Sequence, residues 1–149
     1  METKICNICE KDKLLKHFYP NSKTCKPCYK AKVREYVHTK KGKVTIIYKD
    51  MKARVLGKTG RTSTLYFGLP ICKKEEFYEF SLNDPVFNAL FDKWKESDWD
   101  DDYKPSIDRE IPDKGYVLSN IRWVSYRDNI SRNIDPEKYE LTDDGNLPF

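Results

Sequence analysis

Four cysteines near the N-terminus constrain the fold of this chain more than any other feature. Cys6 and Cys9 form one C-x2-C pair, and Cys25 and Cys28 form a second pair after a gap of 15 residues. Two residues between cysteines allow a turn to direct both sulfur atoms at one tetrahedral ion, and two such turns complete a closed site of four thiolates. The pattern predicts a structural Zn²⁺ ion that contributes folding free energy to a segment too small to bury its own core. Because four thiolates leave no open coordination position, we do not expect this zinc to be catalytic.

Two other readings of these cysteines are weaker. A redox pair or disulfides would suit an oxidising compartment, but the first ten residues lack the apolar core of a signal peptide. His17 could replace one thiolate as a ligand, yet four cysteines already suffice. No apolar run approaches the roughly 18 residues of a membrane span. We therefore expect a soluble protein with no membrane contact. Its expected location is the cytoplasm, or the cytoplasm of the host cell if the protein is phage-encoded. The fifth cysteine, Cys72, is expected to be an ordinary core or loop residue.

Charge is divided unevenly along the chain. Residues 1–62 carry 17 Lys and Arg against 5 Asp and Glu, a balance of +12, whereas residues 63–149 carry a balance of −8, within a net charge of +4. A basic half of this strength favours a polyanionic partner, most often nucleic acid. A solubilising surface is the alternative.

Two apolar stripes at helical spacing follow the cysteines, over residues 29–37 and 44–55. We expect Gly42 to end the first helix. Basic residues fall off both stripes, which predicts a surface that contacts DNA phosphates, with a solvated helix face as the alternative. The candidate DNA-binding residues, including one from the C-terminal region, are Lys30, Lys32, Arg34, Lys49, Lys52, Arg54, Lys58, Arg61 and Arg122.

Two further helices are predicted before the C-terminal region. Residues 72–82 read as a short helix, and residues 83–97 as a second one with Asn83 or Asp84 as its cap and Pro85 in its first turn. The apolar residues of these helices are expected to form core and not a stacking platform. The inward positions are Phe77, Phe80, Val86, Phe87, Leu90, Phe91 and Trp94.

The C-terminal region reads as strand, turn, strand and helix. Ser106–Arg109 is the first strand, residues 120–125 the second, and residues 126–133 the helix, for which Ser125 is a candidate cap. Asp108 on the first strand and Asn129 on the helix could meet across the hairpin. A carboxylate and an amide carbonyl are hard oxygen ligands that suit Mg²⁺ or Mn²⁺, and such an ion can polarise a phosphodiester. A plain surface hairpin is the alternative.

The stretch from Pro105 to Asn129 resembles the ββα-metal (HNH, or His-Me finger) motif of HNH endonucleases. It is similar in particular to a phage-encoded branch, homing endonucleases among its relatives, with P-S-x-D-R, K-G-Y, N-x-R-W-V-S and a final Asn. The four-cysteine knuckle is familiar beside this motif, and the stretches IYKDMKARVLGK and GLPICKKEEFYEFSLNDPVFNALFDKWKES resemble its linker, so the likeness reaches about Arg132. It implies an α+β fold: a zinc knuckle or ribbon, a helical middle and a C-terminal ββα-metal motif.

The resemblance also implies roles for individual residues. Asp108 matches the first metal ligand, Asn129 the last ligand, and Asn120 the central Asn that ties the loop together and orients the base. Trp123 matches an apolar packing position. Arg109 stands where typical members carry the general-base His, and a guanidinium cannot accept a proton near neutral pH.

Arg109 is therefore expected to clamp the scissile phosphate. The proton acceptor stays open among Glu110, Asp128, Tyr116, Tyr126 and a metal-bound hydroxide.

These observations together predict a metal-dependent DNA endonuclease that nicks double-stranded DNA as a monomer or weak homodimer. A DNA-binding protein that keeps the fold without cleaving is the main alternative, and a protein that binds a host factor is a third. The predicted organisation is a zinc module (1–29), a basic helical linker (30–60), a nuclease domain (61–134) and an acidic, flexible tail (135–149).

Overall fold

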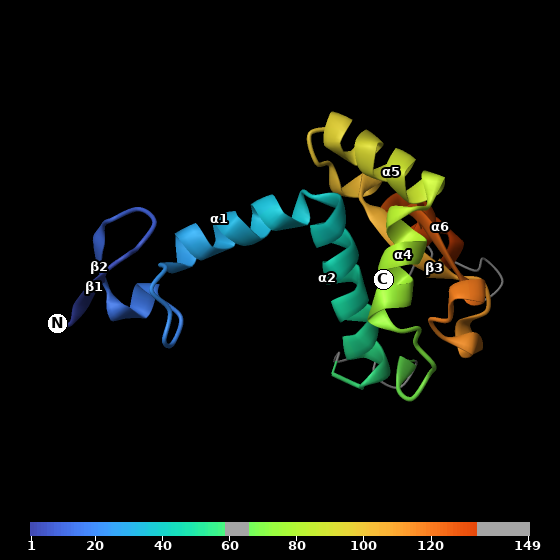
Figure 1. Cartoon of the computed structure of the whole chain (residues 1–149), viewed down its shortest axis with the longest axis horizontal. Coiled ribbons are helices and arrows are strands. Elements are labelled where there is room, and N and C mark those ends of the chain that lie inside the picture. The colour runs from blue at the N-terminus through green and yellow to red at the C-terminus, as the bar shows by residue number, and fades with distance from the viewer. Residues whose placement is uncertain (59–65, 134–149) are drawn as a thin grey trace, which may run out of the picture. The chain divides into compact units, whose positions relative to one another are not determined.

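The computed structural model describes residues 1–58 and 66–133 (Figure 1). The chain forms two compact units, Met1–Lys43 and Val44–Phe149, and each is described by itself. Both combine helices with a small two-stranded sheet, so the α+β class expected from the sequence is confirmed. The finer four-part division stays a prediction, and residues 59–65 and 134–149, which include Arg61 and the acidic tail, lie outside the described residues.

The first unit is built around the cysteine pairs. Strands β1 (Thr3–Ile5) and β2 (Asp12–Leu14) pair antiparallel, and the first C-x2-C turn lies between them. A short 3-10 helix, Leu15–His17, leads toward the second pair, and α1 (Lys26–Val37) begins directly after Cys25, with a proline in its first turn. The predicted helix is present, but none of its residues is buried in the structure. Its apolar stripe therefore does not form a core face among the described contacts.

Gly42 does not end this helix, contrary to the expectation. Helix α1 ends at Val37, and α2 (Lys40–Val55) begins three residues later, with Gly42 in its first turn. The Thr39 side chain joins the two helices, since its Oγ1 donates to the carbonyl of Tyr36 and accepts from the amide of Gly42. A Cβ on Gly42 would lie 1.7 Å from the Tyr36 oxygen, so glycine is present because the turn is tight.

The second unit holds the remaining elements. Most of α2 belongs to it and contributes the buried residues Val44, Tyr48, Met51 and Val55, as its apolar spacing predicted. The other elements are α4 (Lys74–Leu82), α5 (Pro85–Glu96), a 3-10 turn at Asp101–Tyr103, β3 (Pro105–Arg109), two 3-10 turns at Pro112–Lys114 and Leu118–Asn120, β4 (Ile121–Ser125) and α6 (Tyr126–Asn133).

The core of this unit is an aromatic cluster that packs against the hairpin residue Trp123. Trp123 of β4 is 2% exposed, and its ring centroid lies 4.5 Å from that of Phe87 and 5.8 Å from that of Phe77. Its indole Nε1 donates to the Ser81 hydroxyl at 3.1 Å, so the polar atom of the ring is satisfied within the core. The expected packing role of Trp123 is thus confirmed, whereas Val86 lies on the exposed side of α5.

The caps that the sequence indicated are present. The Asp84 carboxylate accepts from the amide of Val86 at the start of α5, and the Ser125 hydroxyl accepts from the amide of Asp128 at the start of α6. Because Ser125 is also the last residue of β4, the cap fixes where the second strand passes into the helix.

Strands β3 and β4 form an antiparallel hairpin that leads into α6, in orange to red in Figure 1. The pairing register sets Asp108 opposite Arg122 and Ile107 opposite Trp123. Between the strands, Gly115 has φ +71° and ψ −155°, a conformation available almost only to glycine. Its backbone packs so closely that a Cβ would lie 2.5 Å from the Pro70 carbonyl oxygen.

The described residues contain no helix with both the length and the apolar character needed to cross a bilayer.

Candidate functional site

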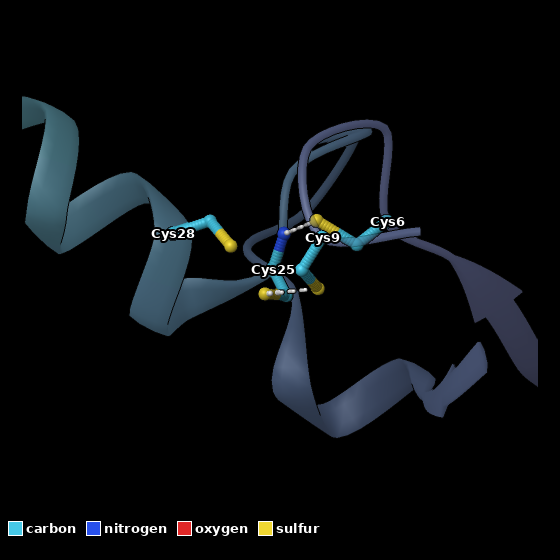
Figure 2. Close-up of side chains that lie close together, drawn as sticks. All are labelled: Cys6, Cys9, Cys25 and Cys28. Carbon is cyan, nitrogen blue, oxygen red and sulfur yellow. Dashed lines mark hydrogen bonds between the residues drawn. The ribbon is translucent and has the colours of Figure 1, made fainter. Parts of the chain in front are cut away.

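The four N-terminal cysteines converge on one point, as Figure 2 shows. Their sulfur atoms all lie within 4.8 Å of one another, and the Cys9 and Cys25 sulfurs are 3.9 Å apart. A tetrahedral zinc site with bonds of about 2.3 Å places its sulfurs about 3.8 Å apart. The cluster therefore fits a Zn²⁺ ion closely, and these four residues could hold one.

Backbone groups and one lysine act on these sulfurs. The amides of Ile8 and Cys25 point at the Cys6 sulfur at 3.4 and 3.3 Å, and the Lys13 ammonium lies 3.3 Å from the Cys25 sulfur. Burial opposes ionisation of Cys6, but these backbone hydrogen bonds outweigh it and lower the pKa of its thiol to about 6. In Cys28, hydrogen bonding to Cys25 raises the pKa to about 12.

Lys13 is a residue that sequence reasoning missed. Four thiolates around Zn²⁺ carry a net charge of −2, and an ammonium in contact with one sulfur offsets part of it. No spacing in the sequence signals this role, because Lys13 reaches the sulfurs through the pairing of β1 with β2. His17 is exposed and lies outside the group of four sulfurs.

The second candidate site is a cavity of about 360 Å³ at the hairpin of the second unit. Asp108 and Asn129 both line it, although they are 21 positions apart in the sequence. The Asn129 amide nitrogen donates to the Ser106 hydroxyl at 2.8 Å and to the Ile107 carbonyl at 3.3 Å, which holds α6 against β3. The two residues thus share one cavity.

Arg122 is engaged differently from its expected role on DNA. Its Nε and Nη2 donate to Oδ2 of Asp108 at 3.1 and 3.0 Å, across the paired strands. The buried Asp108 carboxylate thereby receives a counter-charge. The oxygen atoms of Asp108 and Asn129 are of the type that Mg²⁺ or Mn²⁺ prefers. The Asp108 carboxylate is already paired with Arg122, however, so a divalent ion would have to share it with a guanidinium.

Asn120 braces the loop between the strands. Its side chain is buried, its Nδ2 donates to the carbonyls of Ile111 and Gly115 at 2.8 Å each, and its Oδ1 accepts from the amide of Ile111 at 2.9 Å. Three hydrogen bonds from one amide close the loop around the glycine. This geometry agrees with the bracing part of the role assigned from the motif.

Arg109 and Arg54 also line the cavity. The Arg109 guanidinium lies over the ring of Tyr66, 4.3 Å from its centroid, and donates to the Pro112 carbonyl at 2.7 Å. Arg54, on α2, donates to the hydroxyl of Tyr116 at 3.2 Å. Sequence reasoning placed Arg54 among surface cations and missed Tyr66, because both reach the cavity through long-range packing that no local pattern encodes.

The candidates for the proton acceptor separate into two groups. Tyr116 and Tyr126 line the cavity, whereas Glu110 and Asp128 are exposed and do not line it. Burial raises the pKa of Tyr116, partly offset by the neighbouring Arg54 charge. Because Glu110 and Asp128 do not line the cavity, neither of their carboxylates is placed to accept a proton inside it.

The remaining candidate DNA-binding residues that the structure describes lie on the surface of their units. Lys30, Lys32 and Arg34 are exposed on α1, and Lys49, Lys52 and Lys58 are exposed on or just after α2. Exposure leaves them free to contact a polyanion but does not by itself select one partner.

Comparison with protein-family models, with curated proteins and with solved structures finds no match to this chain.

Proposed function

We propose that this protein is a metal-dependent DNA endonuclease of the HNH type that nicks double-stranded DNA. The observation that carries the proposal is the shared cavity of Asp108 and Asn129 at a hairpin followed by a helix, with Asn120 bracing the connecting loop. The strand, loop, strand and helix order and these three residues match the motif quoted from the sequence. The basic helices supply the second line of support.

Asp108 and Asn129 are the residues that would hold a Mg²⁺ or Mn²⁺ ion. Such an ion supplies charge stabilisation for the leaving oxygen of a phosphodiester. Arg109 contributes a permanent positive charge beside Asp108, where it offsets charge that develops on the phosphate. One such site in each chain favours nicking by a monomer over a double-strand break.

The four-cysteine site has a separate, structural role in this proposal. The buried core of the first unit consists of Cys6, Phe18 and Cys25, with Cys9 and Cys28 packed against it. A core this small depends on a bound ion for its stability. The zinc-bound unit then presents the exposed cations of α1 to the DNA backbone.

A second candidate function, DNA binding without cleavage, is favoured by the Asp108–Arg122 ion pair. A guanidinium already neutralises the carboxylate that a metal would need, and Arg109 occupies the position of the usual base. Under this alternative the hairpin holds a phosphate without cutting it. Within residues 1–58 and 66–133, no contact specifically favours the third function, host-factor binding.

Nicking of a supercoiled plasmid in Mg²⁺ or Mn²⁺ tests the proposal. The wild-type protein is compared with Asp108→Ala and with Asp102→Ala, which removes an exposed carboxylate outside the cavity. We expect nicking by wild type and Asp102→Ala and its loss in Asp108→Ala. Equal nicking by both variants would contradict the assigned site. Steeply salt-dependent binding with no nicking in either metal would select the second function.

A further inference from the structure

Two arginines from distant parts of the second unit are brought to the hairpin cavity. Arg54 lies near the end of α2, and Arg109 is the last residue of β3. Both guanidinium groups lie near the ring of Tyr66, at 5.8 and 4.3 Å from its centroid. Two cations are thus gathered around one aromatic ring at the wall of one cavity.

Each guanidinium is held in place by a partner other than a carboxylate. The Tyr116 hydroxyl accepts from Nη1 of Arg54, and the Pro112 carbonyl accepts from Nη1 of Arg109. The rings of Tyr66 and Tyr116 are nearly parallel, 3° apart in orientation, with centroids separated by 6.2 Å. These contacts fix the direction of both arginines and leave further N–H groups on each.

The cavity carries an excess of positive charge. Among the described residues that line it, the carboxylate is that of Asp108, and Arg122 already pairs with it. Within the described ranges 1–58 and 66–133, neither Arg54 nor Arg109 forms an ion pair. Asp50, one helical turn before Arg54, acts on it only through space and is exposed.

Like charges gathered in a partly enclosed site repel each other, and an anion that contacts both removes this cost. Guanidinium groups match the oxygen atoms of a phosphate in geometry as well as in charge. Ser106 and Tyr126 also line the cavity, and their hydroxyls can add neutral hydrogen bonds.

We infer that this cavity binds a phosphate group through Arg54 and Arg109 without any divalent ion. Tyr116 is a positioning residue, because it directs Arg54 into the cavity and does not itself need to touch the ligand. The inference rests on the proposed function in one respect: the phosphate is that of a nucleic acid, as a backbone diester or as a strand end. It adds a metal-independent contact from α2 to a site that the motif confines to the hairpin and the final helix.

The test uses the zinc-loaded full chain in buffer free of other divalent ions. Inorganic phosphate is titrated first, followed by a short DNA duplex with hydroxyl ends and the same duplex with 5′-phosphate ends. NMR signals of the arginine side-chain Nε–H groups report which guanidiniums respond. The variants are Arg54→Gln, Arg54→Lys, Arg109→Gln and Tyr116→Phe, with Arg127→Gln, an exposed arginine on α6 outside the cavity, as the matched control.

We expect the Arg54 and Arg109 signals to shift together with phosphate. Removal of either guanidinium should weaken binding about tenfold or more, since each makes charge-assisted hydrogen bonds. Arg54→Lys should restore part of the loss, Tyr116→Phe should cost about two- to fivefold, and Arg127→Gln should change little. A thermal unfolding midpoint near that of wild type identifies the variants in which folding is intact.

Several results overturn the inference. These are shifts spread evenly over the surface arginines, equal weakening by Arg54→Gln and Arg127→Gln, or binding that appears only when Mg²⁺ is added. Equal shifts with both duplexes identify the ligand as a backbone diester, and shifts confined to the 5′-phosphorylated duplex identify it as a strand end; both support the site.

Failure of this inference is distinguishable from failure of the proposed function. Phosphate binding that survives Asp108→Ala, in a protein that never nicks, supports the inference and removes the nuclease. Nicking that depends on Asp108, with phosphate binding indifferent to Arg54 and Arg109, does the reverse.

Discussion

Asp108 and Arg122 form an ion pair across the β3–β4 hairpin in which two guanidinium nitrogens contact the same carboxylate oxygen. The distances from Oδ2 to Nε and Nη2 are 3.1 and 3.0 Å. The Asp108 side chain is 8% exposed, whereas that of Arg122 is 46% exposed. A nearly buried carboxylate is therefore paired with a guanidinium that remains accessible to solvent. The same carboxylate is the one that the proposed function assigns to a metal ion.

Replacement of Arg122 by Gln should lower stability and raise metal affinity at the same time. The exposed guanidinium limits the value of the pair, but a nearly buried carboxylate loses the charge of Arg122, so we expect a loss of about 1–2 kcal/mol in the free energy of unfolding. Mn²⁺ should bind more tightly, because a second cation no longer shares the same oxygen. Urea denaturation and Mn²⁺ titration followed by electron paramagnetic resonance measure the two effects.

A double-mutant cycle with Asp108→Asn supplies the control for this prediction. If the pair is real, the two single changes are not additive, and Arg122→Gln costs little in the Asp108→Asn background. Unchanged Mn²⁺ affinity in Arg122→Gln, together with reduced affinity in Asp108→Asn, would show that the arginine does not compete with the metal.

Removal of zinc should unfold the first unit and leave the second folded. The buried core of Met1–Lys43 consists of cysteines and Phe18, whereas the second unit has its own aromatic core. A strong chelator, or the substitution Cys25→Ser, should therefore collapse the amide signals of residues 1–37 into the unfolded range. Those of α4, α5 and the hairpin should be unchanged. NMR spectra and zinc content, expected at one ion in each chain, provide the measurement.

Lys13→Gln provides a milder version of the same experiment. Without the ammonium near the Cys25 sulfur, zinc should remain bound but with weaker affinity, by about tenfold as for other contacts to metal ligands. Lys11→Gln, an exposed lysine two positions earlier, is the matched control. Equal zinc affinity in the two variants would remove Lys13 from the site.

The features that the sequence predicted are local ones. Two residues between cysteines determine a turn, Asp84 and Ser125 cap helices whose first residues follow directly, and apolar spacing identifies the buried face of α2. The prediction that Gly42 ends a helix is wrong. A glycine that ends one helix and a glycine that permits a tight turn at the start of the next helix cannot be told apart in the sequence. Its role is visible only in the approach of the Tyr36 carbonyl.

The features that escaped prediction depend on register and long-range packing. Arg122 meets Asp108 only because the loop length sets them opposite each other in the hairpin. An alternating strand pattern places Arg122 on a polar face but does not reveal its partner. Arg54 reaches the cavity across 62 positions of sequence to Tyr116, a contact that helical periodicity cannot indicate.

Cys72 should react slowly with alkylating agents and should link stability to alkaline pH. Burial raises the pKa of its thiol from 9.0 to about 11. Between these two pH values the thiol is protonated in the folded state and ionised in the unfolded chain. The contribution of Cys72 to the free energy of unfolding is therefore complete below pH 9 and is lost as pH rises toward about 11. Iodoacetamide labelling of the zinc-loaded protein should accelerate about tenfold per pH unit across this range. Labelling already saturated in rate at pH 9 would contradict the raised pKa, and Cys72→Ser gives the background.

Gly115→Ala should destabilise the second unit far more than Gly68→Ala, and the pair isolates a steric cost from a conformational one. Both glycines have positive φ, +71° and +78°, but a Cβ at Gly115 would lie 2.5 Å from the Pro70 oxygen, whereas one at Gly68 meets nothing within 4 Å. The conformational cost at Gly68 is about 1 kcal/mol, and at Gly115 the clash and the glycine-only conformation together should exceed about 3 kcal/mol. Because Asn120 closes the same loop by donating to the Gly115 carbonyl, the alanine should also displace Asn120 and reduce any Asp108-dependent nicking. Equal unfolding free energies for the two variants, measured by urea denaturation, would show that the loop yields without cost and that its closure does not position the hairpin.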